Sequence, residues 1–209
     1  MVNPVVWVAD VGSVAKNRFG WCRAPSRQER DWSVGPRIDA FAQGIADDLS
    51  RGDKVALGFE CPLFVPVAKA DQPEELTSAR EGDDGRAWSA AWGTTVLAVG
   101  LAECVWVFER IRELARQPVQ CTFDWDEFTS GEANLFIWEA FVSKGKKGAS
   151  HVDDARIAAR EFWSNHPRIS EANAVNAHDP YSLAGAGLLR SGLTRDLRVL
   201  FRPCIVIKP

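Results

Sequence analysis

Acidic residues end two apolar, strand-like runs in the first third of the chain. Residues 4–12, PVVWVADVG, lead into Asp10, and residues 54–64, KVALGFECPLF, lead into Glu60. Ligands of α/β proteins bind beyond the carboxyl ends of parallel strands. Carboxylates on neighbouring strand ends repel each other unless a cation or a proton lies between them, and Mg²⁺ prefers oxygen ligands. The two runs therefore predict a site for a divalent cation, Mg²⁺ or Mn²⁺.

Two further acidic residues could complete this site. Glu139 lies inside a buried strand predicted for residues 134–142, and Asp179 stands before Pro180 at a predicted helix start. Four carboxylates could hold two divalent ions, which would stabilise the attacking and leaving oxygens of a phosphodiester. The candidate catalytic residues are Asp10, Glu60, Glu139 and Asp179. Among them, the candidate metal ligands are Asp10, Glu60 and Asp179.

Each of these acids also has an interpretation that needs no ligand. Asp10 suits a turn before Val-Gly, and Asp179 before Pro is a good helix N-cap. Glu60 could be one partner of an ion pair, and Glu139 could form a salt bridge on an edge strand. These alternatives remain open at the level of sequence.

A helix that begins at Ser150 brings two more acids. The spacing Ser150-x-x-Asp153 resembles a capping box, so Asp153 and Asp154 are interpreted first as capping and first-turn acids. We keep both as reserve candidates for the site.

Basic residues near the acids could contact phosphate groups. A basic loop beside an acidic site can bind a nucleic-acid backbone. The candidates are Lys144, Lys146 and Lys147 in the loop SKGKKG, with Arg80 and Arg86 on either side of EGDDG. A solvated turn and ordinary surface arginines are the alternative explanations.

The elements that would position these residues alternate between strands and helices. Residues 4–10 and 54–60 read as buried strands, joined by a helix that Pro36 opens and Gly52 follows, which implies parallel pairing. Residues 17–24 would pair antiparallel with the first strand, with a short third strand at 31–34. The remaining expected elements are a polar loop at 66–87, a helix at 87–116, a strand at 134–142, a helix from 150 to about 163, a helix led by Asp179 and ended by Gly192, and a strand-like run at 197–208. We therefore expect an α/β fold with a mixed sheet flanked by helices.

Length and composition fit one globular domain. The chain has 209 residues, is 46% hydrophobic and carries a formal net charge of −3, so any site for a polyanion must be local or neutralised by metal. We expect a single domain over residues 1–209, with the polar loop and a helical insertion at about 66–117. The five Cys lack zinc-type spacing and are expected to be reduced thiols. Neither a signal peptide nor a membrane span is recognised, so we expect a cytoplasmic protein.

The order of these motifs resembles the ribonuclease-H-like superfamily. VADVGSVAKNRFGW, ALGFECPLF, FIWEAF and an Asp-led closing helix look most like the predicted RNase-H-like nucleases of the DUF429 type. Asp10, Glu60, Glu139 and Asp179 fall on that group's acidic positions in order, although its second acid is more often Asp. The resemblance implies an RNase-H-like fold and a Mg²⁺-dependent nuclease acting on DNA or RNA.

Two other functions are compatible with the sequence. A phosphotransferase of the sugar-kinase and actin-like type also opens with strand-Asp-x-Gly, but it normally has about twice this length and a second glycine-rich phosphate loop. A catalytically inactive RNase-H-like domain that binds nucleic acid is the third possibility. Cleavage of labelled nucleic acids with and without chelator, and ATP turnover, would separate the three.

Overall fold

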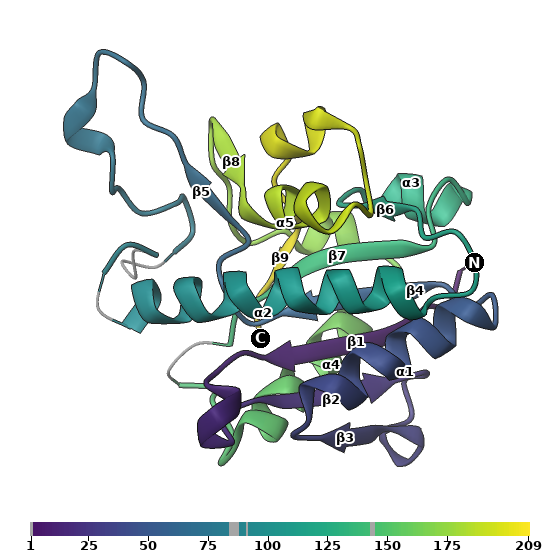
Figure 1. Cartoon of the computed structure of the whole chain (residues 1–209). Helices are drawn as coiled ribbons and strands as arrows, with labels where there is room; N and C mark the ends of the chain where they lie inside the picture. Colours follow the sequence, from purple (N-terminus) through teal and green to yellow (C-terminus); the bar gives the residue numbers. More distant parts are fainter. Residues whose placement is uncertain (1, 84–87, 91, 143–144) are drawn as a thin grey trace.

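A mixed β-sheet forms the centre of the molecule (Figure 1). The computed structural model describes residues 2–83, 88–90, 92–142 and 145–209. Within them the sheet has the strand order β3-β2-β1-β4-β7-β6, and β9 pairs with β7. Its strands are β1 (Val5–Asp10), β2 (Gly20–Ala24), β3 (Ser33–Gly35), β4 (Val55–Phe59), β6 (Cys121–Thr122), β7 (Leu135–Ala140) and β9 (Val206–Ile207).

Helices cover both faces of this sheet. The α-helices are α1 (Ile38–Ser50), α2 (Trp92–Leu114), α3 (Trp125–Ser130), α4 (His151–Asn165) and α5 (Leu183–Ser191). Short 3-10 turns are η1 (Val14–Lys16), η2 (Glu29–Asp31), η3 (Pro73–Glu75), η4 (Ile169–Ala172) and η5 (Leu197–Phe201). A separate two-stranded sheet pairs β5 (Phe64–Pro66) with β8 (Pro180–Ser182).

The strand directions match the α/β fold class expected from the sequence. β1, β4 and β7 run parallel, whereas β2 pairs antiparallel with β1 and β3 pairs antiparallel with β2. A hairpin followed by parallel strands, in this order, is consistent with an RNase-H-like fold. The predicted mixed sheet with flanking helices is confirmed.

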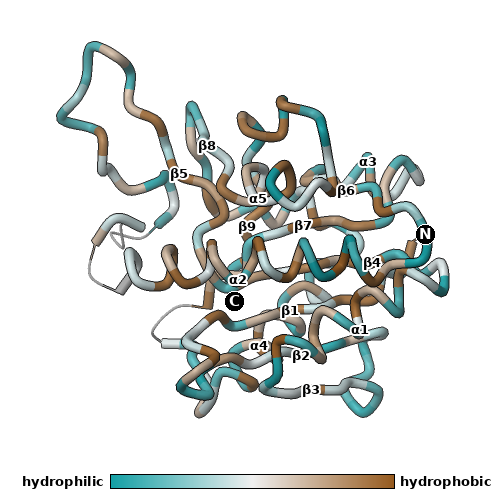
Figure 2. Tube along the Cα trace, viewed as in Figure 1, coloured by the Kyte–Doolittle hydropathy of each residue, from teal (hydrophilic) through white to brown (hydrophobic). Residues whose placement is uncertain are grey.

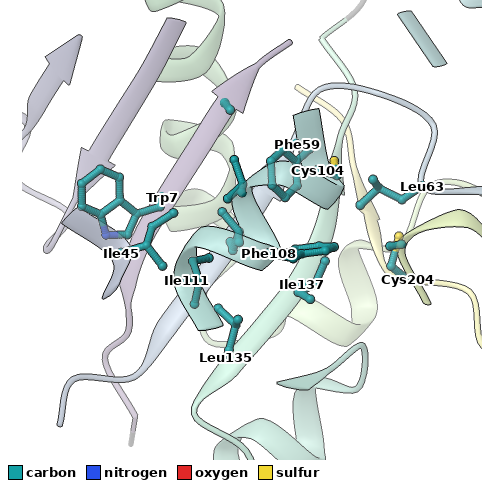
Figure 3. Packing of buried hydrophobic residues seen from close by; sticks show 14 of the residues in the cluster. Trp7, Ile45, Phe59, Leu63, Cys104, Phe108, Ile111, Leu135, Ile137 and Cys204 are labelled. Atoms are coloured by element: carbon teal, nitrogen blue, oxygen red, sulfur yellow. The ribbon is translucent and has the colours of Figure 1, made fainter. Parts of the chain in front are cut away.

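Alternate residues of each strand pack on opposite faces of the sheet, because successive side chains of a strand point to opposite sides. Trp7, Phe59 and Ile137 belong to one buried cluster, together with residues of α1, α2 and α5 (Figure 3). Val8 and Trp138 belong to a second cluster, which α3 and α4 complete. Figure 2 shows hydrophobic residues along the three parallel strands that lie between these layers. The same alternation determines which acidic side chains share a face of the sheet.

The helix predicted between the first two parallel strands is confirmed. In α1, Phe41, Ile45 and Leu49 are buried at four-residue spacing, as a helix packed on a sheet requires. The helix expected at 87–116 is present as α2. Gly100 fits inside it because a Cβ there would lie 2.5 Å from Cys61 Sγ, so the glycine lets α2 approach the end of β4.

The C-terminal part differs from expectation. Asp179 does not begin a helix; residues 180–182 form β8, and α5 starts at Leu183 with the Ser182 side chain accepting a hydrogen bond from Gly185 N. The run at 197–208 is a 3-10 turn followed by the short strand β9, consistent with Pro203 between them. The sequence prediction also missed β6 and α3. None of the helices in the described ranges combines the length and hydrophobicity that crossing a bilayer requires.

Candidate metal centre

Asp10 and Glu60 end neighbouring parallel strands on the same face. β1 and β4 pair in register up to Ala9 and Phe59, and Glu60 N donates to Ala9 O at 2.8 Å. Asp10 follows Val6 and Val8 on the face that packs against α4. The same alternation places Glu60 on that face, because Phe59 points to the other one. The sequence prediction that these two carboxylates meet is therefore supported by the geometry.

A third carboxylate comes from the first turn of α4. Ser150 caps this helix, accepting a hydrogen bond from Asp153 N, and Asp154 lies on the buried stripe with Ala155 and Ala158. β2 allows the helix to start close by, because Gly20 lies opposite Asp10 in the ladder. A Cβ at Gly20 would lie 2.4 Å from Val152 N.

Asp10, Glu60 and Asp154 form a compact buried cluster. One carboxylate oxygen from each lies within 4.8 Å of the others, and the three residues are only 4%, 8% and 5% exposed. Burial raises the pKa of Asp10 to about 7; Lys147 opposes this shift and Asp154 adds to it. Burial, and next the charge of Asp10, raise the pKa of Glu60 well above its usual range. The fold thus holds these acids together against their mutual repulsion.

Two basic side chains of the described residues contact the cluster. Lys147 Nζ lies 3.3 Å from Glu60 Oε1 and 3.6 Å from Asp154 Oδ2. His151 Nδ1 contacts Asp10 Oδ2, although burial and then Lys147 lower the pKa of the imidazole. Gly148 N donates to Asp154 Oδ1 at 2.6 Å. Lys147, predicted to lie beside the acidic site, does so.

The donor set fits a hard divalent cation. All three side chains offer carboxylate oxygens, which suit Mg²⁺ and Mn²⁺ rather than softer metals. Glu60 Oε2 is buried and has no hydrogen-bond partner among the described residues. A buried acceptor without a partner costs about 1–3 kcal/mol, which a bound cation would recover. The cluster could therefore hold a metal ion.

Glu139 lies on the opposite face of the sheet and does not join this cluster. It pairs with Phe59 in the β4–β7 ladder and so points away from α4. Its two oxygens accept hydrogen bonds from Arg80, both at 2.7 Å, and Leu63 N donates to Oε2 at 2.9 Å. Glu139 thus has the ion-pair role that the sequence left open as its alternative.

Arg80 is buried in the same ion-pair network. Its guanidinium also binds Asp83, with Nη2 to Oδ1 at 3.0 Å, and Nη1 donates to Phe64 O at 3.3 Å. This arrangement commits Arg80 to Glu139 and Asp83 rather than to a phosphate group.

The remaining sequence candidates lie apart from the three acids or outside the described residues. Asp179 is exposed, and its backbone carbonyl accepts a hydrogen bond from Val67 N at 2.8 Å. Because Ser182 caps α5, Asp179 is not the N-cap either. Lys146 is exposed in the loop before α4, whereas Lys144 and Arg86 lie outside the described residues.

Glu103 of α2 is a further buried acid beside the cluster. Burial raises its pKa to about 7, a hydrogen bond from the Gly12 backbone opposes the shift, and its charge adds to the raised pKa of Asp10. Its Oε2 atom is buried without a hydrogen-bond partner among the described residues. The sequence prediction passed over Glu103.

Asp154, kept as a reserve candidate, joins the site, and one signal in the sequence could have favoured it more strongly and also identified Glu103. Asp154 shares a helical stripe with Ala158 and Phe162, and Glu103 shares one with Val107 and Ile111. An acid on the apolar stripe of an amphipathic helix must be buried, which is unusual for a carboxylate without a partner.

A pocket of about 440 Å³ lies elsewhere. It is lined by Val2, Trp125, His166 and neighbouring residues, at the amino end of β1, so it is separate from the acids at the carboxyl end.

Comparison of the chain with protein-family models, curated proteins and solved structures finds no match.

Proposed function

We propose that this protein is a divalent-metal-dependent phosphodiesterase that cleaves a nucleic acid. The observation that carries the proposal is the cluster of Asp10, Glu60 and Asp154, in which one oxygen from each residue lies within 4.8 Å of the others. Glu60 Oε2 also has no hydrogen-bond partner within the part of the chain that the structure describes. The cluster stands at the carboxyl ends of adjacent parallel strands, where α/β sheets bind ligands. The resemblance to RNase-H-like nucleases of the DUF429 type supports the same reaction.

The three carboxylates would hold Mg²⁺ or Mn²⁺. When bound, such an ion neutralises charge on a phosphodiester and makes a water molecule more acidic. His151, through its contact with Asp10 Oδ2, orients that carboxylate.

Positively charged side chains that could contact the substrate lie next to the acids. Lys146 and Lys147 precede α4, and about half of the Lys147 side chain is exposed. With a net charge of −3 on the chain, contact with a nucleic-acid backbone would depend on such local cations and on the bound metal ion.

Cleavage of labelled single- and double-stranded DNA and RNA tests the proposal. We expect product with Mg²⁺ or Mn²⁺, none with chelator, and loss of cleavage in Asp10→Asn, Glu60→Gln and Asp154→Asn. Asp153→Asn is the matched control, because Asp153 lies on the same helical turn but outside the cluster. It should retain activity.

Three outcomes would contradict the proposal in different ways. Binding of nucleic acid with no cleavage under any metal condition would favour the inactive binding domain. ATP turnover without cleavage of nucleic acid would favour the phosphotransferase. Cleavage that persists in Asp10→Asn would show that another site is responsible.

A further inference from the structure

Lys147 binds the same carboxylates that are proposed to bind the metal. Its Nζ atom lies 3.3 Å from Glu60 Oε1 and 3.6 Å from Asp154 Oδ2. We infer that Lys147 and a divalent ion compete for these carboxylates, so that metal binding releases the ammonium from Glu60 and Asp154. This inference rests on the proposed function and adds a change of partner at the same site.

Electrostatics explains the competition. Glu60 and Asp154, together with Asp10, each contribute one oxygen to the cluster, and these oxygens lie within 4.8 Å of one another. A divalent ion bound to that set would be only a few ångströms from an ammonium on the same side chains, where like charges repel strongly in a partly buried site. The ion binds three carboxylates and carries twice the charge, so it is the stronger competitor.

The loop geometry lets the side chain leave without moving its backbone. Gly148 is held against α4, since its N–H donates to Asp154 Oδ1 at 2.6 Å and a Cβ there would lie 2.4 Å from Asp153 Cβ. The Lys147 side chain itself is 52% exposed. A half-exposed lysine on a flexible four-carbon stem can rotate into water at little cost.

Release would prepare the site for its substrate. Paired with two carboxylates, Lys147 has little charge to offer to an anion. Once released, it remains next to the bound ion and can pair with a phosphate oxygen of the backbone. Metal binding and binding of the nucleic-acid backbone would then favour each other.

Amine labelling followed by mass spectrometry tests the release directly in the wild-type protein. Lysine labelling rates are compared with and without Mg²⁺ at equal ionic strength. We expect Mg²⁺ to raise the rate at Lys147 by about threefold or more, because the ion pairs that hold it are lost. Lys146, its exposed neighbour, is the internal control and should not change. An unchanged rate at Lys147, while calorimetry shows that Mg²⁺ binds, would overturn the inference.

Metal affinity supplies a second test. Lys147→Met keeps most of the stem and removes the charge, so its Kd for Mn²⁺ should be about tenfold lower than that of the wild type. Lys146→Met should bind Mn²⁺ like the wild type. An equal or higher Kd for Lys147→Met would overturn competition and leave the metal site standing. Absence of Mn²⁺ binding in all three proteins would instead refute the proposed function and this inference with it.

Discussion

Asp10→Asn should stabilise the fold in the absence of divalent ions. Asp10 is buried, and its pKa is raised from 3.8 to about 7, mainly by burial. The folded protein therefore resists ionisation of this group, and that cost is removed when the side chain is a neutral amide of nearly the same shape. A residue proposed to be essential for function should thus be unfavourable for stability.

The raised pKa sets the magnitude and its dependence on pH. A shift from 3.8 to about 7 corresponds to at most about 4 kcal/mol at about 1.4 kcal/mol per unit. Because the amide also loses the carboxylate's contact with His151, we expect a net gain of about 2–3 kcal/mol. Between the two pKa values the folded state holds more protons than the unfolded state, so the wild type loses stability as the pH rises. The advantage of the variant should therefore be near zero at about pH 4 and full above about pH 7.

Urea unfolding followed by tryptophan fluorescence can measure the difference. With chelator, the free energy of unfolding of Asp10→Asn should exceed that of the wild type by about 2–3 kcal/mol at about pH 8, equivalent to a Tm higher by roughly 5–10 °C. Excess Mg²⁺ should cancel most of this difference, since an ion at one hundred times its Kd stabilises the wild type by about 2.7 kcal/mol. Asp71 is exposed, so Asp71→Asn serves as the control. It should change neither the free energy of unfolding with chelator nor the stabilisation by Mg²⁺.

Two results would refute this reasoning. If Asp10→Asn is less stable than the wild type at about pH 8 with chelator, the cluster is not under electrostatic strain. If the difference between the two proteins does not vary with pH, the carboxylate of Asp10 does not titrate in the expected range.

Other parts of the structure allow three further predictions. Arg80→Met should cost about 3–5 kcal/mol in urea unfolding by leaving Glu139 and Asp83 buried without their partner, and adding Glu139→Gln should restore part of that loss; no recovery would contradict the ion pair's assigned role. Gly20→Ala should weaken Mn²⁺ binding by about tenfold because its Cβ would meet the start of α4, whereas Gly145→Ala, with open space around its Cβ, should not; equal affinities would contradict the close approach. Glu103→Gln should raise the free energy of unfolding by about 1–2 kcal/mol at about pH 8 and by almost nothing at about pH 4, since burial raises the pKa of Glu103 to about 7; a uniform change across pH would point to packing instead.

The sequence was sufficient to predict the first half of the site. Asp10 and Glu60 end strands that one crossover helix joins, so parallel pairing alone brings them to the same edge. The face on which each acid points was harder to predict. In β7 both alternating sets are apolar, Leu135 with Ile137 and Phe136 with Trp138. Alternation therefore could not show that Glu139 faces away from α4; only its register with Phe59 does so.

The third acid was assigned a local role because local signals are strong at a helix start. Ser150 and Asp153 do form the expected cap, and the same capping pattern accounted for Asp154 as a first-turn acid without requiring a site. For Asp179 the local signal was misleading. The sequence Asp-Pro favours a helix start, but the residues that follow Asp179 form β8 and pair with β5, and the helix begins only after Ser182. Long-range pairing overrode a local preference there.

The two acidic clusters at this end of the sheet differ in how their charge is balanced. Glu139 is paired with Arg80, whose guanidinium is always charged and binds both of its oxygens from a buried position. Asp10, Glu60 and Asp154 instead face a half-exposed lysine and a histidine whose lowered pKa favours its neutral form. Among the described residues, one ammonium faces three buried carboxylates, and burial first, with the neighbouring carboxylates adding to it, raises the pKa of Asp10 and Glu60. The Glu139 cluster is thus built to remain as it is, whereas the Asp10 cluster needs a proton or a cation from solution, as a binding site for a divalent ion would.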